Sequence, residues 1–206
     1  MAKIFAIHPD NPQARLLRQA AEIIQNGGIV VYPTDSGYAL GCRLGDRVAI
    51  ERIRQLRQLD KDHNMTLLCR DLSSLSTYAK VTNPIFRLLK AFTPGSYTFI
   101  LKATKEVPKL MLHPQRKTLG LRVPDYTIVL SLLECLNLPL VNTSLTLPGE
   151  TVPLSEPGAI RDLLGARIDL FIDGGTCDAN PTTVIDLTGD YPEIIRKGKG
   201  DTAPFE

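Results

Sequence analysis

Polar side chains directly after a buried strand are the first candidates for chemistry in this sequence. Thr34, Asp35 and Ser36 follow the apolar run 28–32 and the rigid Pro33. A carboxylate and two hydroxyls at such a turn can hydrogen-bond a small polar ligand. The alternative is a plain Asx-type turn, in which these side chains bond only to the local backbone. The residue types alone leave both interpretations open.

Two further segments carry hydroxyl groups next to expected strands. Residues 142–146 read Asn-Thr-Ser-Leu-Thr after a strand at 138–141, and residues 181–183 read Pro-Thr-Thr before a strand at 184–187. Hydroxyl and amide groups at this density suit contacts with phosphate or ribose oxygens. The candidate ligand-binding hydroxyls from these segments are Ser144, Thr146 and Thr182.

Cationic side chains occur near the same segments. Arg122 ends an expected strand, where its guanidinium could hold a carboxylate or phosphate through two parallel hydrogen bonds, each worth about 1.5–3 kcal/mol when desolvated. Arg57 lies on a basic helical segment with Arg52 and Arg54, and Lys61 follows it. This segment either meets phosphates or only solvates one face of a helix.

Basic and acidic residues are segregated along the chain, although the net charge is only +2. Residues 80–122 hold nine basic residues against one acidic, whereas residues 123–195 hold eleven acidic against two basic. Unless folding mixes the two signs, this segregation predicts a polarised surface that attracts phosphates. The residues that we expect to neutralise RNA phosphates are Lys90, Lys102, Arg116, Lys117 and Arg122.

Helical and strand patterns alternate along most of the chain. Helices are expected after Pro12, Asp46, Asp71 and Thr82 and over 107–112, 127–136 and 157–164. Strands are expected at 4–7, 28–32, 38–42, 65–68, 97–101, 119–123, 138–141, 169–172, 184–187 and 194–195. This alternation predicts an α/β domain with a twisted open mixed sheet covered by helices. Ligands of such sheets usually lie at the carboxyl ends of strands, here after Tyr32, Val123, Val141 and Ile172.

Length and composition fit one ordinary globular domain. The chain has 206 residues, of which 43% are hydrophobic and 22% charged. At about 150 residues per domain, we expect a single domain and a short, loosely held C-terminal tail at 197–206. No apolar run approaches the ~20 residues of a membrane helix, and the first residues do not read as a signal peptide. We therefore expect a cytoplasmic protein without membrane contact.

The common nucleotide and metal motifs are absent from the sequence. It has neither a P-loop, nor a G-x-G-x-x-G turn, nor the G-x-S-x-G of a nucleophile elbow. Its four cysteines and three histidines are scattered, with no C-x-x-C pair and no H-x-x-x-H. We therefore expect buried reduced thiols, no metal site and no tightly bound cofactor.

Taken together, these motifs resemble those of the YrdC-like family of threonylcarbamoyl-AMP synthase-like proteins, most of all its YciO branch. The matching segments, in family order and spacing, are 33–42 (Pro-Thr-Asp-Ser-Gly-Tyr-Ala-Leu-Gly-Cys), Pro94-Gly95-x-x-Thr98, Arg122-Val123, Thr143-Ser144 and 181–186 (Pro-Thr-Thr-Val-Ile-Asp). The match covers about residues 11–196 and implies one YrdC-like domain with a basic concave face. For the best-understood members it also implies synthesis of threonylcarbamoyl-adenylate from threonine, bicarbonate and ATP, the first step of threonylcarbamoyladenosine formation in tRNA.

The resemblance also implies roles for individual residues. It places Thr34 in the threonine-binding turn, Ser144 in a Ser-x-Asn motif, Thr182 at a substrate-binding serine, and Arg122 and Arg196 near the nucleotide. Two motifs differ, because Lys-x-Arg becomes Arg57-Gln58-Leu59 and Ser-x-Asn becomes Ser144-Leu145-Thr146. Leu59 cannot stabilise the charge that develops on pyrophosphate, although Lys61 stands two residues away.

These observations support two hypotheses on function. The first is a nucleotidyltransferase-like protein that binds ATP, accompanied by Mg²⁺, or an acyl- or carbamoyl-adenylate in tRNA modification. The second is a protein that binds double-stranded or structured RNA without catalysis, an activity that the resemblance implies for some relatives. The absence of Trp and the aromatic content of 6% argue against a platform that stacks single-stranded bases. A paralogue with an unrelated role is the third option.

Overall fold

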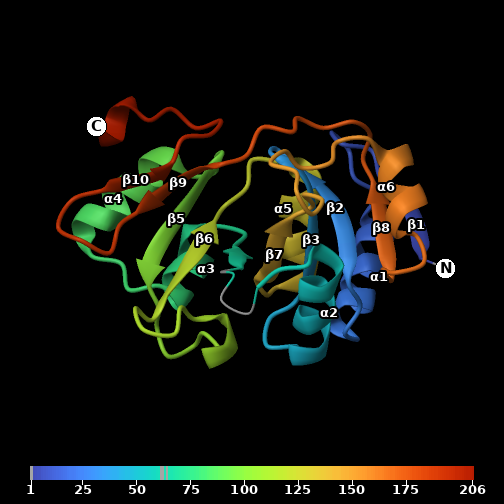
Figure 1. Ribbon diagram of the computed structural model, residues 1–206, viewed down its shortest axis with the longest axis horizontal. Helices are drawn as coiled ribbons and strands as arrows, with labels where there is room; N and C mark the ends of the chain where they lie inside the picture. The colour runs from blue at the N-terminus through green and yellow to red at the C-terminus, as the bar shows by residue number, and fades with distance from the viewer. Residues whose placement is uncertain (1, 61–62, 64) are drawn as a thin grey trace.

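The computed structural model describes residues 2–60, 63 and 65–206, and within these residues ten strands form one mixed sheet (Figure 1). The strands are β1 (Lys3–Ala6), β2 (Val30–Thr34), β3 (Gly37–Arg43), β4 (Thr66–Leu68), β5 (Tyr97–Lys102), β6 (Thr118–Arg122), β7 (Leu140–Ser144), β8 (Leu170–Asp173), β9 (Thr183–Asp186) and β10 (Glu193–Arg196). Their order across the sheet is β1-β8-β2-β3-β7-β4-β6-β5-β9-β10, with parallel and antiparallel neighbours. The expected open mixed sheet is confirmed.

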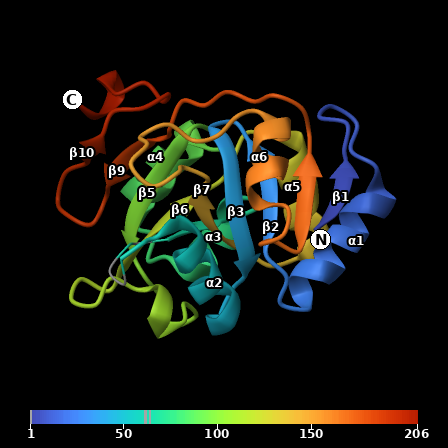
Figure 2. The same ribbon diagram turned by 45° about the vertical axis from the view of Figure 1, so that its right-hand side comes forward.

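Helices pack on both faces of this sheet, which confirms the expected α/β class. The α-helices are α1 (Ala14–Gln25), α2 (Arg47–Arg57), α3 (Leu72–Tyr78), α4 (Asn83–Phe92), α5 (Thr127–Leu136) and α6 (Pro157–Leu164). On one face, buried residues of α1 and α5 share a cluster with Tyr32 of β2 and Leu140 of β7. On the other face, buried residues of α2, α3, α4 and α6 share a cluster with Val31 of β2 and Phe99 of β5. Figures 1 and 2 place α1 beside β1 and β8 at one end of the sheet, and α4 beside β9 and β10 at the other.

Part of one face is left open beyond α1 and α5. On β4, Leu68 joins the cluster of these two helices, but Thr66, on the same face, lines a cavity. On β6, Leu121 packs into the opposite core while its neighbours Gly120 and Arg122 line the same cavity. On β4 and β6, alternation along the strand therefore turns Thr66, Gly120 and Arg122 toward the cavity, whereas Leu121 faces the opposite core.

Capping residues explain where two of the helices begin. The Asp46 carboxylate accepts a hydrogen bond from the Ala49 amide at 3.0 Å, and Asp71 accepts one from Ser74 at 2.7 Å. Each satisfies an amide that the first helical turn leaves unpaired. The short helix expected near 107–112 is present only as a 3₁₀ turn at Lys109–Met111. Prolines at 108 and 114 leave too few residues between them to propagate an α-helix.

The C-terminal segment 197–206 is packed against the sheet rather than loosely held, so that expectation was wrong. The Lys199 amide donates to the Pro181 carbonyl at 2.8 Å. Phe205, only 8% exposed, packs against the rings of Phe92 and Tyr97. The Gly and Pro content suggested a mobile end, but backbone hydrogen bonds and an aromatic residue near the terminus hold this segment in place.

Candidate functional site

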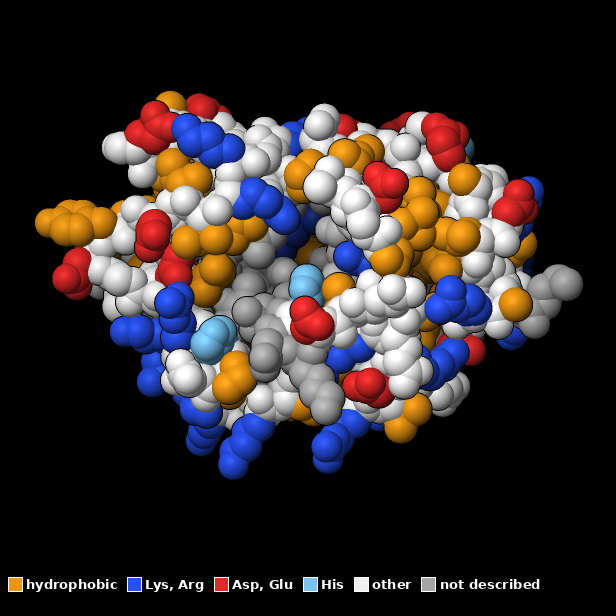
Figure 3. Space-filling model, viewed as in Figure 1, with side chains coloured by type: hydrophobic (Ala, Val, Ile, Leu, Met, Phe, Trp, Pro, Cys, Tyr) orange, Lys and Arg blue, Asp and Glu red, His pale blue; other side chains and the backbone are white. Residues whose placement is uncertain are grey.

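A cavity of about 280 Å³ opens on the half of the sheet that α1 and α5 leave uncovered. Its floor consists of side chains from β4, β5, β6 and β7, and its walls include the end of α2 and the segments around residues 151–153 and 181–182. Figure 3 shows a hollow near the middle of the molecule with basic side chains inside it. The site therefore lies on the face of the sheet, whereas the sequence had placed it in loops at the carboxyl ends of strands.

The floor of the cavity is a row of paired residues on four adjacent strands. Ile100 of β5 lies opposite Gly120 of β6, Gly120 lies opposite Thr66 of β4, and Thr66 lies opposite Asn142 of β7. A Cβ atom at Gly120 would come within 3.2 Å of both the Thr66 hydroxyl and the Thr98 methyl group. The glycine keeps the floor low, so that a ligand can approach the polar groups beside it.

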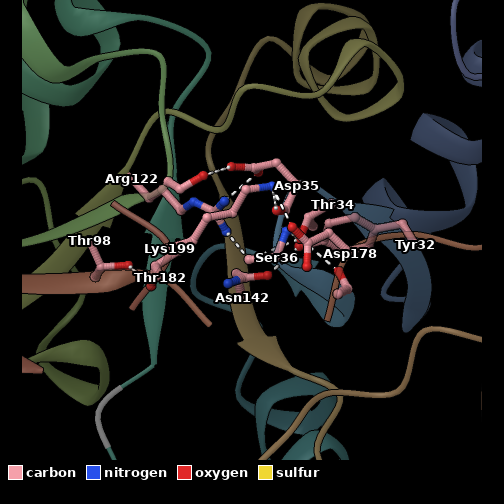
Figure 4. A network of polar contacts seen from close by, with 12 residues as sticks. Tyr32, Thr34, Asp35, Ser36, Thr98, Arg122, Asn142, Asp178, Thr182 and Lys199 are labelled. Atoms are coloured by element: carbon pink, nitrogen blue, oxygen red, sulfur yellow. Dashed lines mark hydrogen bonds and ion pairs between the residues drawn. The ribbon is translucent and has the colours of Figure 1, made fainter. Parts of the chain in front are cut away.

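Arg122 is a buried cation of this cavity, with 3% of its surface exposed. Its guanidinium donates to an Asp35 carboxylate oxygen and, at 2.8 Å, to the Ser36 hydroxyl (Figure 4). Among the described residues, the buried Nε of Arg122 has no hydrogen-bond partner. A desolvated cation that retains an unused donor favours an oxygen of an anionic ligand.

Arg196 and Arg57 bring two further guanidinium groups to the cavity. Arg196 donates from Nε and Nη2 to the Thr182 carbonyl at 3.1 and 2.8 Å, and Arg57 donates to the Ser144 carbonyl. Burial lowers the pKa of both arginines, and the charge of Arg122 also lowers that of Arg196. Both nevertheless stay protonated at neutral pH, because the pKa of a free guanidinium lies above 12. Both side chains are thus fixed in place by backbone carbonyls, and neither forms an ion pair with another described residue.

Neutral hydroxyl and amide groups complete the lining. The Thr98 and Thr182 hydroxyls are 2.9 Å apart, and the Tyr32 hydroxyl donates to Asn142 Oδ1 at 2.6 Å. Burial raises the pKa of Tyr32, which keeps this hydroxyl protonated. Because an amide oxygen has two lone pairs, Asn142 can still accept a second hydrogen bond at its oxygen and donate from its nitrogen to a ligand.

The turn 34–37 contacts Arg122 of the cavity lining, but the Thr34 hydroxyl of this turn bonds within the turn itself. Thr34 donates to the Gly37 carbonyl at 2.7 Å and accepts from the Ser36 amide at 3.1 Å. Asp35 instead bonds outward, to Arg122 and to the Ser96 hydroxyl at 2.9 Å. The local-turn interpretation therefore holds for Thr34, which does not line the cavity. Asp35 and Ser36 instead orient Arg122, the most buried cation of the cavity.

The cavity brings together most of the ligand-binding residues named from the sequence: Arg57, Arg122, Ser144, Thr146, Thr182 and Arg196. Lys61 lies outside the residues that the structure describes.

Sequence reasoning missed two residues of the cavity lining, Thr66 and His63. The signal for Thr66 was a polar residue within the otherwise apolar run 65–68. Burial and the charges of Arg57 and Arg54 lower the pKa of His63, so it is neutral at pH 7 and adds hydrogen-bonding capacity without charge.

The basic residues named for RNA do not form one surface. Lys102, Arg116 and Lys117 are exposed around the end of the β5–β6 hairpin, where Lys102 lies opposite Thr118. Lys90 belongs to α4, which packs on the opposite face, and it lines a separate groove with Arg70. Arg122 is buried in the cavity. The five residues thus occupy three places, and the basic concave face stays a prediction.

Across residues 2–60, 63 and 65–206, no helix is long and apolar enough to span a bilayer. In the same part of the chain, no three side chains of His, Cys, Asp or Glu are grouped as metal ligands.

The chain is similar over its whole length to bacterial proteins of the same size. It is 57% identical over 205 residues to YciO of Escherichia coli strain K12, with 100% of both chains covered. The crystal structure of E. coli YciO superposes with a TM-score of 0.97 at 56% identity, again covering 100% of both chains. The fold described above is therefore shared by a solved structure of similar sequence.

Relatives whose names state an activity or a ligand are more distant. Threonylcarbamoyl-AMP synthase of Vibrio vulnificus is 30% identical over 186 residues, which cover 88% of this chain and 98% of that protein. The crystal structure of Pyrococcus abyssi Sua5 complexed with L-threonine has a TM-score of 0.87 at 27% identity, covering 95% of this chain and 57% of that one. The family model Sua5/YciO/YrdC, described as "Telomere recombination", matches residues 22–198. The resemblance drawn from the motifs is thus confirmed, and the chain belongs to the Sua5/YciO/YrdC family.

Proposed function

We propose that the cavity binds ATP or an acyl- or carbamoyl-adenylate, in a role related to tRNA modification of the threonylcarbamoyladenosine type. One observation carries the proposal. Two arginines of the lining, Arg57 and Arg122, each have a buried Nε without a hydrogen-bond partner among the described residues. Such donors are costly to bury unless a ligand satisfies them. The phosphate oxygens of a nucleotide are suited to fixed guanidinium groups.

Hydroxyl and amide groups in the same cavity suit the remainder of a nucleotide. Thr98, Thr182 and Asn142 offer donors and acceptors near the cations, as ribose hydroxyls or an acyl group require. Mg²⁺ would enter with the phosphates of ATP, since Mg²⁺ is often held by substrate phosphates and waters. The similarity to threonylcarbamoyl-AMP synthases supports this ligand class.

Efficient adenylate formation is a separate claim from binding, and we expect it to be slow. The second cation of the family's Lys-x-Arg motif is replaced by Leu59, whose side chain packs against the hydrophobic core. Charge that develops on the departing pyrophosphate therefore lacks one fixed cation, and cations of this kind stabilise such transition states. Ligand binding does not require that stabilisation.

A panel of ligands tests the proposal through thermal unfolding of the full chain. ATP, AMP, threonine and tRNA are added separately, and release of pyrophosphate from ATP with threonine and bicarbonate is measured in parallel. A nucleotide at about 100 times its Kd stabilises the folded state by about 2.7 kcal/mol, which raises the Tm by roughly 5–10 °C. We expect that shift with ATP or AMP and little pyrophosphate release. An unchanged Tm with both nucleotides would reject the proposed ligand class.

Binding of structured RNA is a second candidate, favoured by the exposed position of Lys102, Arg116 and Lys117 around one hairpin end. Neutralising three phosphates would lower the logarithm of the affinity by about 2.7 per tenfold rise in salt. Replacing the three residues with Ala is expected to flatten this dependence. A salt-independent affinity of the unmodified protein would exclude this candidate.

A further inference from the structure

The C-terminal segment 197–206 places a lysine beside the turn that carries Asp35. Lys199 Nζ donates to the Asp35 carbonyl oxygen at 3.1 Å and pairs with Asp178 Oδ2 at 2.7 Å. Figure 4 shows the Lys199 side chain reaching from the side of Thr98 and Thr182 toward Asp35 and Asp178. The lysine therefore connects its own segment to two others that are distant in sequence, one of which carries the partner of Arg122.

The backbone around Lys199 is fixed on both sides of the residue. The Gly198 amide donates to the Thr183 hydroxyl at 3.0 Å, and the same hydroxyl donates to the Gly200 carbonyl at 2.6 Å. A Cβ atom at Gly198 would lie 2.4 Å from the Pro181 carbonyl oxygen, and one at Gly200 would lie 2.5 Å from the Tyr97 ring. Two glycines thus let the chain pass close to the sheet, which sets the direction of the Lys199 side chain.

Hydrogen bonds from three residues hold the turn 34–37 toward the β5–β6 half of the sheet. Ser96 and Arg122 bond to the Asp35 carboxylate, and Lys199 bonds to its carbonyl. Lys199 and Asp178 are 38% and 36% exposed at their side chains, so their ion pair contributes little to global stability. Its effect must be local, on the position of the turn that orients Arg122.

We propose that Lys199 is a positioning residue of the cavity. Its hydrogen bond to the Asp35 carbonyl, here called the latch, holds the turn 34–37 and thereby keeps Arg122 in place for an anionic ligand. Without this tie, the Asp35 backbone moves more freely, and the Arg122 guanidinium moves with its partner. The identity of the ligand rests on the proposed function, but the latch itself does not. Asp178 holds the ammonium group in place from the opposite side.

Hydrogen exchange of the ligand-free full chain tests the latch directly. Lys199→Met removes the charge and the donor, and Lys197→Met is the matched control. Lys197 lies in the same segment and forms an ion pair of 2.8 Å with Glu206, inside that segment. We expect the amides of residues 34–38 to exchange about fivefold faster in Lys199→Met and at the unmodified rate in Lys197→Met. Equal exchange in Lys199→Met and the unmodified protein would overturn the proposal.

Titration with ATP then tests the consequence for binding. We expect Lys199→Met to weaken ATP binding about fivefold, with a Tm within about 2 °C of the unmodified protein, and Lys199→Arg to bind nearly normally. Equal affinity in Lys199→Met, or equal loss in Lys197→Met, would contradict a positioning role. If the unmodified protein binds no ATP, the proposed function fails, while faster exchange in Lys199→Met still supports the latch.

Discussion

Replacing Arg122 with Met is expected to lower the free energy of unfolding by about 3–5 kcal/mol, because it leaves a buried carboxylate without its counter-charge. Asp35 is 9% exposed, and its carboxylate pairs with the Arg122 guanidinium. The Ser96 hydroxyl is too weak a partner to replace a full positive charge. The measurement is urea denaturation at pH 7.

Two comparisons separate this effect from a general loss of packing. The double variant Arg122→Met with Asp35→Asn removes both charges, so it should recover much of the lost stability. Lys197→Met breaks an ion pair whose side chains are 69% and 54% exposed, and it should cost about 0–1 kcal/mol. A loss below about 1 kcal/mol for Arg122→Met would show that the Asp35–Arg122 pair is not buried as described.

Arg57→Met and Arg196→Met are expected to weaken ATP binding by about tenfold to 100-fold each. Each variant removes a charged donor that lines the cavity, and a hydrogen bond to a charged group is worth about 1.5–3 kcal/mol. Calorimetric titration gives the affinities. Backbone carbonyls anchor both guanidinium groups, so replacement with Met removes the charge and also the fixed position of the hydrogen-bond donors.

Arg161→Met is the control for these two variants. Arg161 is an exposed residue of α6, which packs on the opposite face of the sheet from the cavity. Its replacement changes the net charge of the protein by the same amount and should leave the affinity for ATP unchanged. Equal binding by all three variants would mean that the cavity arginines do not contact the nucleotide.

Local patterns predicted much of the secondary structure. The sequence placed α5 at 127–136 and α6 at 157–164, and both helices have these bounds. These segments combine helical periodicity with clear start signals, such as Pro157 at the first position of α6. The order of the strands could not be predicted, because it depends on pairings such as β4 with β7 that join residues far apart in sequence.

The position of the candidate site was harder to predict than the types of residue that line it. Asn142 and Ser144 were expected in a loop after a strand ending at Val141, but β7 continues to Ser144. Their side chains therefore alternate onto the sheet face and line the cavity there. Strand ends depend on the length of the neighbouring strand, here β3, and a single segment does not contain that information.

The partner of Arg122 was also beyond local reasoning. Asp35 and Arg122 are separated by 87 residues, and each looked like an independent ligand-binding group. In the structure Asp35 neutralises part of the Arg122 charge and fixes its orientation. The sequence singled out both residues but not the contact between them.

A crystal structure of the full chain grown with ATP and Mg²⁺ tests the central claim most directly. We predict phosphate oxygens between Arg57, Arg122 and Arg196, with the Nε of Arg122 within hydrogen-bond distance of one of them. Nucleotide bound only at Lys102 and Lys117, or a cavity that stays empty at saturating ATP, would contradict the claim.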